Sequence, residues 1–278
     1  MDILAHEPAF RLTVFGSILV TMALAELLAP RRALTAPKAR RWAVNISITA
    51  INTLLARLAF PAGAVGVALY ASAHGLGLFN LMPLSSPWAG VASFVLLDLL
   101  IYTQHVVFHR IPLLWRLHMM HHTDLDLDVT SGARFHPIEI VLSLLIKALA
   151  VLALGAPAWS VVAFEVALNA TAMFNHSNVR LPWLLDRVLR RVVVTPDMHR
   201  VHHSVLIREI NSNFGFNLPW WDFIFHTYIP VPRDGHQGMK IGLANFRRFE
   251  ELGLMRVLAL PFSAKAEAVR MRQRGGKP

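Results

Sequence analysis

The feature that most limits how this chain can fold is a series of long apolar stretches. Three of them are long enough to cross a lipid bilayer as helices: residues 12–29, 43–72 and 88–108. A hydrocarbon core about 30 Å thick requires roughly 20 mostly apolar helical residues, and each stretch approaches or exceeds that length. The second stretch contains Arg57 and Pro61 but is otherwise apolar. With 55% hydrophobic and only 16% charged residues, the chain has the composition of an integral membrane protein.

Two shorter apolar stretches follow at 138–154 and 157–174, separated by little more than Gly155 and Ala156. Glycine commonly ends a helix, so we expect a tight hairpin of two helices over 138–174. The lengths leave open whether this hairpin crosses the bilayer or only enters it. We therefore predict an all-α integral membrane helical bundle of three clear spans plus a helical hairpin, with a cytosolic helical cap rich in histidine. The residues before the first span form no basic n-region, and we expect that span to be retained as an anchor.

The distribution of positive charge predicts the orientation of the bundle. Residues 31–41 contain five Lys and Arg and no acidic residue, which places this loop in the cytoplasm by the positive-inside rule. The hairpin then begins and ends inside. Residues 176–278 carry 16 Lys and Arg against 8 Asp and Glu, and no later stretch is long enough to span. We expect one membrane domain over 1–278, with a basic cytosolic tail over 229–278 whose last residues, 264–278, are frayed.

Composition also limits the chemistry. Inner loops that face anionic headgroups are expected to be basic, which accounts for the net charge of +10, and without a nucleic-acid binding motif we expect no nucleic-acid partner. The chain has no cysteine, which excludes disulfides, cysteine-ligated zinc, iron–sulfur clusters and cysteine nucleophiles. A bound metal must therefore be held by His, Asp or Glu. Histidine is abundant, at 14 of 278 residues, and most of the histidines are clustered.

Nine of the histidines fall in short motifs within 99 residues. The motifs are His105-x-x-x-His109, His118-x-x-His121-His122, a lone His176, and His199-x-x-His202-His203. Residues three or four positions apart on a helix share a face, which lets two imidazoles approach one ion. The charge argument puts all nine on the cytoplasmic side. Since one ion takes about four to six ligands, nine imidazoles are too many for one metal but sufficient for two, each with an open position.

Ligand chemistry narrows the choice of metal without fixing it. Imidazole suits zinc, copper, iron and nickel. The zinc-protease motif HExxH is absent, because Val, Met and Arg follow His105, His118 and His199, so no glutamate is placed as a general base. The ExxH pairs of soluble di-iron bundles are absent as well. Two other functions stay open at this point: a zinc-dependent membrane hydrolase or isomerase that uses the same imidazoles, and a metal transporter with a histidine-rich mouth.

Six motifs lie between residues 98 and 228: DLLIYTQHVVFH, WRLHMMHH, DVTSGARFHPIE, FNHSNV, TPDMHRVHH and NSNFGFNLPWWDFIFHTY. Together they resemble the fatty acid hydroxylase and sterol desaturase superfamily, the integral membrane di-iron oxygenases that carry histidine boxes. The resemblance implies two iron ions in a histidine-box region over 98–228, with zinc as a substitute metal. The ligands that it implies are His105, His109, His118, His121, His122, His176, His199, His202 and His203.

The resemblance also implies supporting polar residues. A ligating imidazole normally donates its other N–H to a carboxylate or carbonyl, which fixes the ring. The residues at family positions suited to this role are Asp98, His136, Asn175, Asn178, Asn213 and Asp222. For Asp98 a local role or a pair with Arg57 stays open. For His136 a role as a supplementary ligand or a structural hydrogen bond at the start of the hairpin stays open as well. Where members usually read WDxxFGT, this chain has His226 in place of the glycine, and we expect that residue at the surface.

The reaction that the resemblance implies is O2-dependent hydroxylation, or desaturation, of an unactivated C–H bond in a lipid or sterol-like substrate. An apolar pocket between helices admits such a substrate from the bilayer and excludes water. Candidate wall residues are Trp115, Phe135, Phe174, Trp220 and Trp221. The chain carries no nucleotide-binding or haem-binding motif, so we expect a separate ferredoxin or cytochrome with its reductase to supply electrons. Arg200 and Arg208 are candidates for docking an acidic donor on the basic face.

Overall fold

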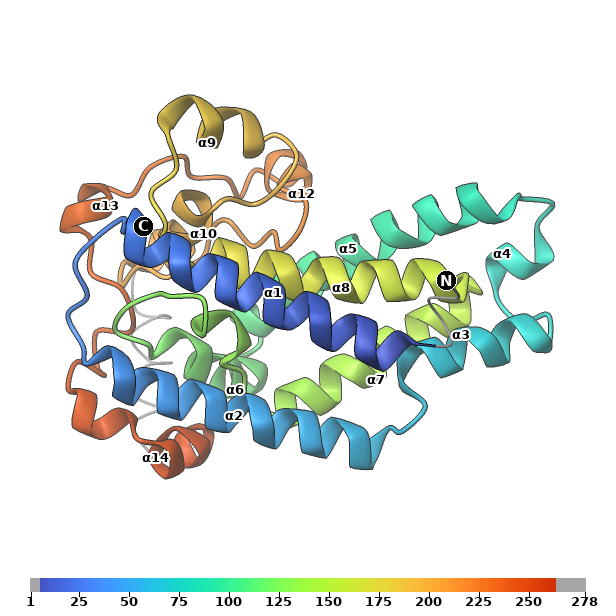
Figure 1. The fold of residues 1–278 in the computed structure, drawn as a ribbon, viewed down its shortest axis with the longest axis horizontal. Coiled ribbons are helices and arrows are strands. Elements are labelled where there is room, and N and C mark those ends of the chain that lie inside the picture. The colour runs from blue at the N-terminus through green and yellow to red at the C-terminus, as the bar shows by residue number, and fades with distance from the viewer. Residues whose placement is uncertain (1–5, 264–278) are drawn as a thin grey trace.

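Long helices run the length of the molecule and end in a cap of short helices and loops, as the computed structural model shows (Figure 1). The structure describes residues 6–263, and the predicted frayed end 264–278 lies outside them. The described part contains no β-strand, and extended backbone pairs there only at two isolated bridges, Pro30 with Val179 and Ser204 with Ile241. The prediction of an all-α bundle with a histidine-rich cap is confirmed for these residues.

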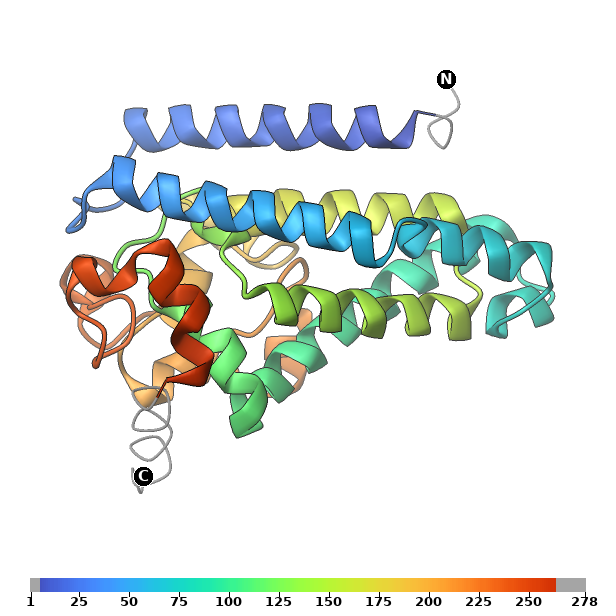
Figure 2. The ribbon, with the colours of Figure 1, turned by 90° about the horizontal axis from the view of Figure 1, so that it is seen from below.

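The long helices form the bundle. They are α1 (Glu7–Leu28), α2 (Lys38–Ala59), α3 (Gly63–Ala73), α5 (Ser86–Arg110), α7 (Pro137–Leu154) and α8 (Ala158–Asn175), with the short α4 (Leu78–Leu81) at the end farthest from the cap. Within residues 6–263, four stretches are long and apolar enough to cross a membrane: α1, Lys38–Leu81, α5 and α7. Figure 2 shows α1 along one side of the bundle, where it packs against α8. Buried Ala68, Leu97 and Phe164 fill the space between α3, α5 and α8.

Proline and glycine set the breaks between these helices. The predicted span 43–72 is two helices instead of one, because Pro61 has no N–H to donate, and α2 ends before it while α3 begins beyond it. The predicted hairpin is formed by α7 and α8. Gly155 ends α7 in the left-handed conformation, at φ 63°, and a Cβ added there would lie only 2.7 Å from the carbonyl oxygen of Leu76. Glycine is therefore required both by the turn and by the close approach.

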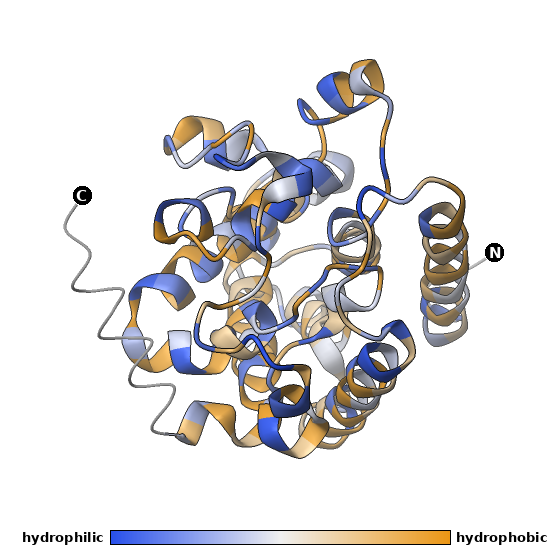
Figure 3. Cartoon of the chain, turned by 90° about the vertical axis from the view of Figure 1, so that its left-hand side faces the viewer, coloured by the Kyte–Doolittle hydropathy of each residue, from blue (hydrophilic) through white to orange (hydrophobic). Residues whose placement is uncertain are grey.

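The cap is built from short helices and the loops between them. They are α6 (Pro112–His122), η1 (Ser131–Ala133), α9 (Trp183–Leu189), α10 (Pro196–His202), α11 (Ile207–Ile210), α12 (Trp220–Ile224), α13 (Gly235–Gly238), η2 (Phe249–Leu252), α14 (Leu254–Ala259) and η3 (Leu260–Phe262). Figure 3 looks onto this end, and polar residues are spread over the cap while α1 at the edge is mostly apolar. Phe246, Leu252 and Val257 are buried in one cluster with Trp115 of α6. Residues 229–263 thus pack into the cap through apolar side chains such as these, and their assignment to a basic cytosolic tail stays a prediction.

A buried ion-pair network joins the cap to the bundle. Arg41 at the start of α2 is only 2% exposed. It donates to both carboxylate oxygens of Asp124, at 2.7 and 2.8 Å, and to Asp128 at 2.7 Å. Near the end of α1, the buried Glu26 accepts from the backbone N–H of Val129 at 2.7 Å. These contacts hold the loop that follows α6 against the cap ends of α1 and α2. Because the network is buried, removing one partner would leave an uncompensated charge and destabilise the fold.

Candidate metal centre

Four helices bring the nine predicted histidines together where the bundle meets the cap. By helix, the positions are His105 and His109 on α5; His118, His121 and His122 on α6; His176 directly after α8; and His199, His202 and His203 on α10 and at its end. All nine are buried, and none is more than 7% exposed. Nine histidines from segments far apart in sequence thus share one interior, as the spacing of their motifs predicts.

The nine imidazoles divide into two groups. The five-histidine group consists of His105, His109, His118, His122 and His202, and the four-histidine group of His121, His176, His199 and His203. Within each group, one ring nitrogen of every residue lies within 4.8 Å of those of the others. Successive residues on a helix point about 100° apart, so the adjacent pair in each HxxHH motif contributes to different groups, while the i, i+4 pair stays together.

Hydrogen bonds at Nδ1 orient five of the rings from outside. The Nδ1 atom of His118 lies 2.7 Å from Oε1 of Glu139, which is buried near the start of α7. The other four partners, at 2.7–3.2 Å, are backbone carbonyls: Phe214 for His105, Arg134 for His121, Ala172 for His176 and Ser212 for His202. A neutral ring that donates outward from Nδ1 presents an unprotonated Nε2 to the interior, where it can bind a metal.

The inward nitrogens have the spacing of ligands that share an ion. Nε2 of His109 and Nε2 of His122 are 3.1 Å apart in the five-histidine group. In the four-histidine group, Nε2 of His176 lies 3.1 Å from Nε2 of both His121 and His199. Two nitrogens bound to one ion at about 2.0–2.1 Å stand about 2.9–3.4 Å apart for ligand angles between a right angle and a tetrahedral one. The observed separations fall within that range.

Ring nitrogens without a hydrogen-bond partner also indicate a metal site. Nε2 of His105, His118 and His202 is buried and has no hydrogen-bond partner among the described residues. A buried polar atom without a partner costs free energy, so native proteins rarely keep one unless an ion, a ligand or water completes it. These donor atoms are soft enough and numerous enough for two transition-metal ions with positions left open. The residues therefore fit metal ions in both groups.

Burial keeps the imidazoles in the protonation state that metal binding requires. It lowers the pKa of His202 to about 3 and that of His176 to about 4, although the carbonyl hydrogen bond of each ring acts in the opposite direction. Burial also lowers the pKa of His121, His122, His199 and His203 well below its ordinary value, and the neighbouring imidazoles lower it further. Neutral imidazole is the form that ligates metals, so no proton has to leave these rings near neutral pH.

Aromatic rings line the two groups. The ring of Phe135 stacks on His121 with centroids 4.3 Å apart and planes 8° apart, and Trp115 lies 4.8 Å from His109. Phe214 and Phe216, which we did not predict, each have their ring centroid 5.4 Å from that of His105. These side chains keep water away from the imidazoles. The other predicted wall residues, Phe174, Trp220 and Trp221, make no ring contact with an imidazole among residues 6–263.

Residues 90–227 match the sequence profile of the fatty acid hydroxylase family. This range contains all nine histidines, Glu139 and the four carbonyl groups that orient the rings. The chain belongs to the fatty acid hydroxylase family.

Three curated relatives illustrate the range of this fatty acid hydroxylase family. The chain is 30% identical over 175 residues to the ornithine lipid hydroxylase OlsE of Rhizobium tropici, a match that covers 63% of this chain and 50% of the relative. It is 30% identical over 157 residues to the alkylglycerol monooxygenase of Homo sapiens, covering 54% and 33%. It is 27% identical over 161 residues to the fatty acid hydroxylase vlmA of Lecanicillium sp, covering 50% and 43%. The chain thus spans half or less of the length of these relatives, and no solved structure gives a significant match.

One predicted supporting residue, Asp222, acts on the candidate metal centre through a single peptide unit. Asp222 is fully buried and accepts from the amides of Phe214 and Gly215, both at 2.8 Å. The carbonyl of Phe214 is in turn the partner of His105 Nδ1. Burial raises the pKa of Asp222 to about 6, against the lowering effect of its hydrogen bonds. Asp222 therefore positions the Phe214 carbonyl that accepts the hydrogen bond from His105 Nδ1, without touching the imidazole ring.

The other five supporting residues lie elsewhere. Asn213 donates to Met198 O, Asn175 to Phe216 O and Asn178 to Arg32 O; Asp98 accepts from Trp221 Nε1 at 2.8 Å; and His136 lies 3.1 Å from Leu258 O. Across residues 6–263, none of the six hydrogen-bonds to an imidazole of either group, contrary to the expectation that they orient the rings directly. They fix the loops that surround the centre, and His136 also caps α7 by accepting from Ile138 N–H.

Glu139 is the orienting residue that sequence reasoning missed. It stands at the third position of α7, in the motif RFHPIE, at the head of an otherwise apolar helix. A carboxylate in an apolar segment is expensive and is by itself a sign of function. That signal was present in the sequence, in the same motif as His136.

His226, which replaces the glycine of the family motif WDxxFGT, lies at the surface. His226 is exposed and adopts a positive φ of 56°, a conformation that glycine takes without strain. The turn it forms ends α12 and lets the N–H of Thr227 donate to the carbonyl of Asp222 at 2.9 Å. Since His226 points into solvent, the missing glycine leaves the two histidine groups unchanged.

Proposed function

We propose that the two histidine groups bind two iron ions and that this protein uses O2 to hydroxylate, or to desaturate, an unactivated C–H bond of a lipid or sterol-like substrate. The observation that carries the proposal is the convergence of nine buried imidazoles in two groups inside the region that matches the family. The names of the relatives support it, because ornithine lipids, alkylglycerols and fatty acids all carry long alkyl chains. A bound pair of irons supplies O2 activation and hydrogen abstraction from such a chain.

The chain's own residues prepare this chemistry in three ways. Glu139 and the carbonyls hold the rings with Nε2 inward, which fixes the donor set before any ion arrives. Trp115, Phe135 and Phe216 exclude water, which protects a reactive oxidant from quenching. The group with four imidazoles leaves more open positions on its ion than the group with five, so we propose that the four-histidine group exposes the more accessible metal.

Apolar side chains of the cap support access from the bilayer. Trp183, Leu184 and Val188 on α9 and Ile224 on α12 are exposed, and Figure 1 places α9 and α12 on the same side of the cap. A large exposed apolar surface next to a membrane bundle is typical of contact with lipid. We propose that this surface faces the membrane interface, so that the alkyl chain of a substrate enters without crossing water.

The cap end of the bundle carries the basic loop 31–41, and we propose on this ground that the histidines lie on the cytoplasmic side. A separate ferredoxin or cytochrome with its reductase supplies electrons in this proposal. Arg208 is exposed and suits docking of an acidic donor. Arg200 does not, because it is fully buried, pairs with Asp197 and donates to Ser177 O at 3.1 Å. The expectation that Arg200 docks the donor was wrong.

The test is metal analysis combined with lipid profiling. The purified full-length protein is loaded anaerobically with Fe(II) and its metal content is measured, with His105→Gln, His176→Gln and, as a control, the exposed His74→Gln. We expect two irons per chain in the parent and in His74→Gln, and a loss of iron in each of the other two. Cells that express the protein should contain a lipid that gains one oxygen atom or loses two hydrogens, and the two variants should abolish that product.

Two further measurements separate the oxygenase from the two alternatives. Two zinc ions with activity under nitrogen would indicate a hydrolase or isomerase, and vectorial metal flux in proteoliposomes would indicate a transporter. Transport sites are usually formed near the middle of a bundle, whereas His105, His109 and His176 stand at the cap ends of α5 and α8. This placement favours the oxygenase.

A further inference from the structure

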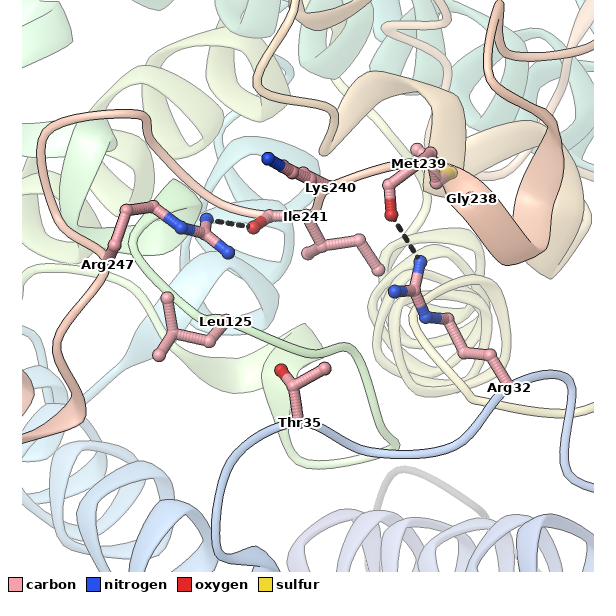
Figure 4. A pocket seen from close by; sticks show the side chains of 8 residues that line it. All are labelled: Arg32, Thr35, Leu125, Gly238, Met239, Lys240, Ile241 and Arg247. Atoms are coloured by element: carbon pink, nitrogen blue, oxygen red, sulfur yellow. Dashed lines mark hydrogen bonds between the residues drawn. The ribbon is translucent and has the colours of Figure 1, made fainter.

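A pocket of about 440 Å³ opens on the cap, away from the histidines. It is lined by Arg32, Thr35, Leu125, Gly238, Met239, Lys240, Ile241 and Arg247 (Figure 4). The α1–α2 loop forms one side and the segment 238–247 the other. None of the nine histidines lines the pocket, and its volume is in the range of small-molecule sites. The pocket is therefore a separate feature whose role the proposed reaction does not explain.

Positive charge dominates this pocket. Arg32 and Arg247 face it from opposite sides, and Lys240 stands between them at the rim (Figure 4). Backbone carbonyls hold both guanidinium groups: Arg32 donates to Met239 O at 2.9 Å and to His236 O at 3.3 Å, and Arg247 donates to Ile241 O. The ammonium of Lys240 makes no hydrogen bond or ion pair with another residue of 6–263, and no acidic residue is among the described lining residues. Three cations are thus held close together, and they keep N–H groups that are available to bind an anion.

The acids near these cations do not neutralise them, since Asp234, which interacts electrostatically with Lys240, is already paired with Arg233. Asp126 is buried, and its carboxylate accepts from the backbone N–H groups of Thr35 and Ala36, both at 2.8 Å. Partial burial lowers the pKa of Arg32 and of Arg247, and Asp126 is the acid that opposes this effect at each. One carboxylate that is already engaged by two amides leaves an excess of positive charge in the pocket.

We propose that this pocket binds a phosphate group, either that of a soluble phosphorylated compound or that of a lipid headgroup. The guanidinium fork matches the oxygens of a phosphate, and a mobile ammonium adds a point charge. The concave shape favours a compact anion over the flat surface of an acidic protein. The inference does not depend on metal binding, since no predicted metal ligand is among the lining residues.

Occupation of the pocket reaches the metal centre through the backbone. Its wall pairs with the segment that follows α10: the N–H of Val205 donates to Lys240 O at 3.0 Å, and the N–H of Gly242 donates to His203 O at 2.9 Å. His203 is a member of the four-histidine group. A phosphate that draws Arg32, Lys240 and Arg247 together therefore stabilises the backbone on which one predicted ligand stands.

The test measures phosphate binding by the full-length protein in phosphatidylcholine nanodiscs. Inorganic pyrophosphate is titrated while the unfolding temperature and the hydrogen exchange of residues 239–242 are followed. In a second arm, phosphatidate is included in the nanodisc and no pyrophosphate is added. Lys240→Glu reverses the one lining charge that holds no other group, and Arg208→Glu is its matched control, an exposed arginine outside the pocket.

We expect saturable stabilisation and slower exchange at 239–242 in the parent and in Arg208→Glu, and at least tenfold weaker binding in Lys240→Glu. A response to pyrophosphate identifies a soluble phosphate as the source, and a response to phosphatidate alone identifies a lipid headgroup. Equal binding by Lys240→Glu and the parent overturns the proposal. The proposal is also overturned if neither pyrophosphate nor phosphatidate gives a response. This includes the case in which Lys240→Glu differs from the parent only in its binding of an acidic electron-transfer protein.

Discussion

Glu139 Oε1 lies 2.7 Å from His118 Nδ1, whereas backbone carbonyls take the corresponding place beside Nδ1 of His105, His121, His176 and His202. Both residues are buried, His118 at the inner end of α6 and Glu139 at the head of α7. The contact therefore links a predicted metal ligand of the cap to a membrane helix. A carboxylate partner makes an imidazole a stronger ligand than a carbonyl partner does.

Replacing Glu139 with Gln should weaken metal binding in the five-histidine group. The amide keeps the shape and a hydrogen bond but removes the negative charge that strengthens His118 as a ligand. We expect a loss of about 10–100-fold in metal affinity, measured by competition with a chelator. Glu209→Gln is the matched control, because Glu209 is equally buried and its carboxylate accepts from the Arg233 amide instead of an imidazole. Equal metal affinities in the two variants would contradict the role of Glu139.

The metal-free protein should lose stability in mild acid. Burial lowers the pKa of His176 to about 4 from an ordinary value of 6.5. Because the folded value is the lower one, the unfolded chain takes up a proton first as the pH falls. The contribution of this residue is thus complete above pH 6.5 and is lost between 6.5 and about 4, a change of about 3 kcal/mol in the free energy of unfolding.

This pH dependence is measured as the unfolding midpoint of chelator-treated protein across that range. His176→Gln, which cannot take up a proton, should give a flatter profile than the parent. The exposed His74→Gln should keep the slope of the parent. Parallel profiles for His176→Gln and the parent would rule out His176 as a source of the acid lability.

A charged cluster inside the bundle should be sensitive to loss of a single partner. Glu165 on α8 pairs with Lys147 on α7 and, at 2.6 Å, with Arg11 on α1. Glu165→Leu leaves Lys147 without its carboxylate partner among apolar helices, while Arg11 keeps its ion pair with Glu7. We expect the free energy of unfolding to fall by about 3–5 kcal/mol. Adding Lys147→Met to Glu165→Leu should recover part of that loss. Thermal unfolding in detergent measures both, and a double variant no more stable than the single one would show that the ion pair is not the cause.

Substituting glycine for His226 should stabilise the protein. At φ 56° a residue with a Cβ is strained, and glycine relieves this at the cost of some chain entropy. We expect a gain of about 1 kcal/mol in the free energy of unfolding and an unchanged metal content. Gly235→Ala is the reverse control, because Gly235 has φ 66° and a Cβ there would meet nothing within 4 Å. A stabilising Gly235→Ala, or a destabilising His226→Gly, would contradict this account of the turn.

The histidine motifs show how much of the site helix periodicity alone predicts. Spacings of three and four predict that His118 and His122 share a helix face, and they do, because helix periodicity is a property of the backbone alone. The same periodicity separates His121 from His122, but it does not predict which other histidines join His121. That assignment depends on where α8 and α10 place His176 and His199, which is a matter of packing between helices.

Charge patterns were less reliable than periodicity. Arg41 is one of the five positive charges that place the loop 31–41 in the cytoplasm by the positive-inside rule, yet it is buried against Asp124 and Asp128. Likewise Arg200 is enclosed beside Asp197. Composition gives the number of charges, whereas their exposure depends on which acids the fold brings within reach.

The sequence by itself determined the apolar helices, the breaks at Pro61 and Gly155 and the nine histidines, because these follow from hydrophobic length, backbone chemistry and helical spacing. Only the tertiary structure decided the division into five and four, the choice of Glu139 over Asp98 as a partner, and the folding of residues 229–263 into the cap. Four of the five outer partners are backbone carbonyls, which every residue carries. No side-chain pattern marks which carbonyl will be used, so only the packed loops select it.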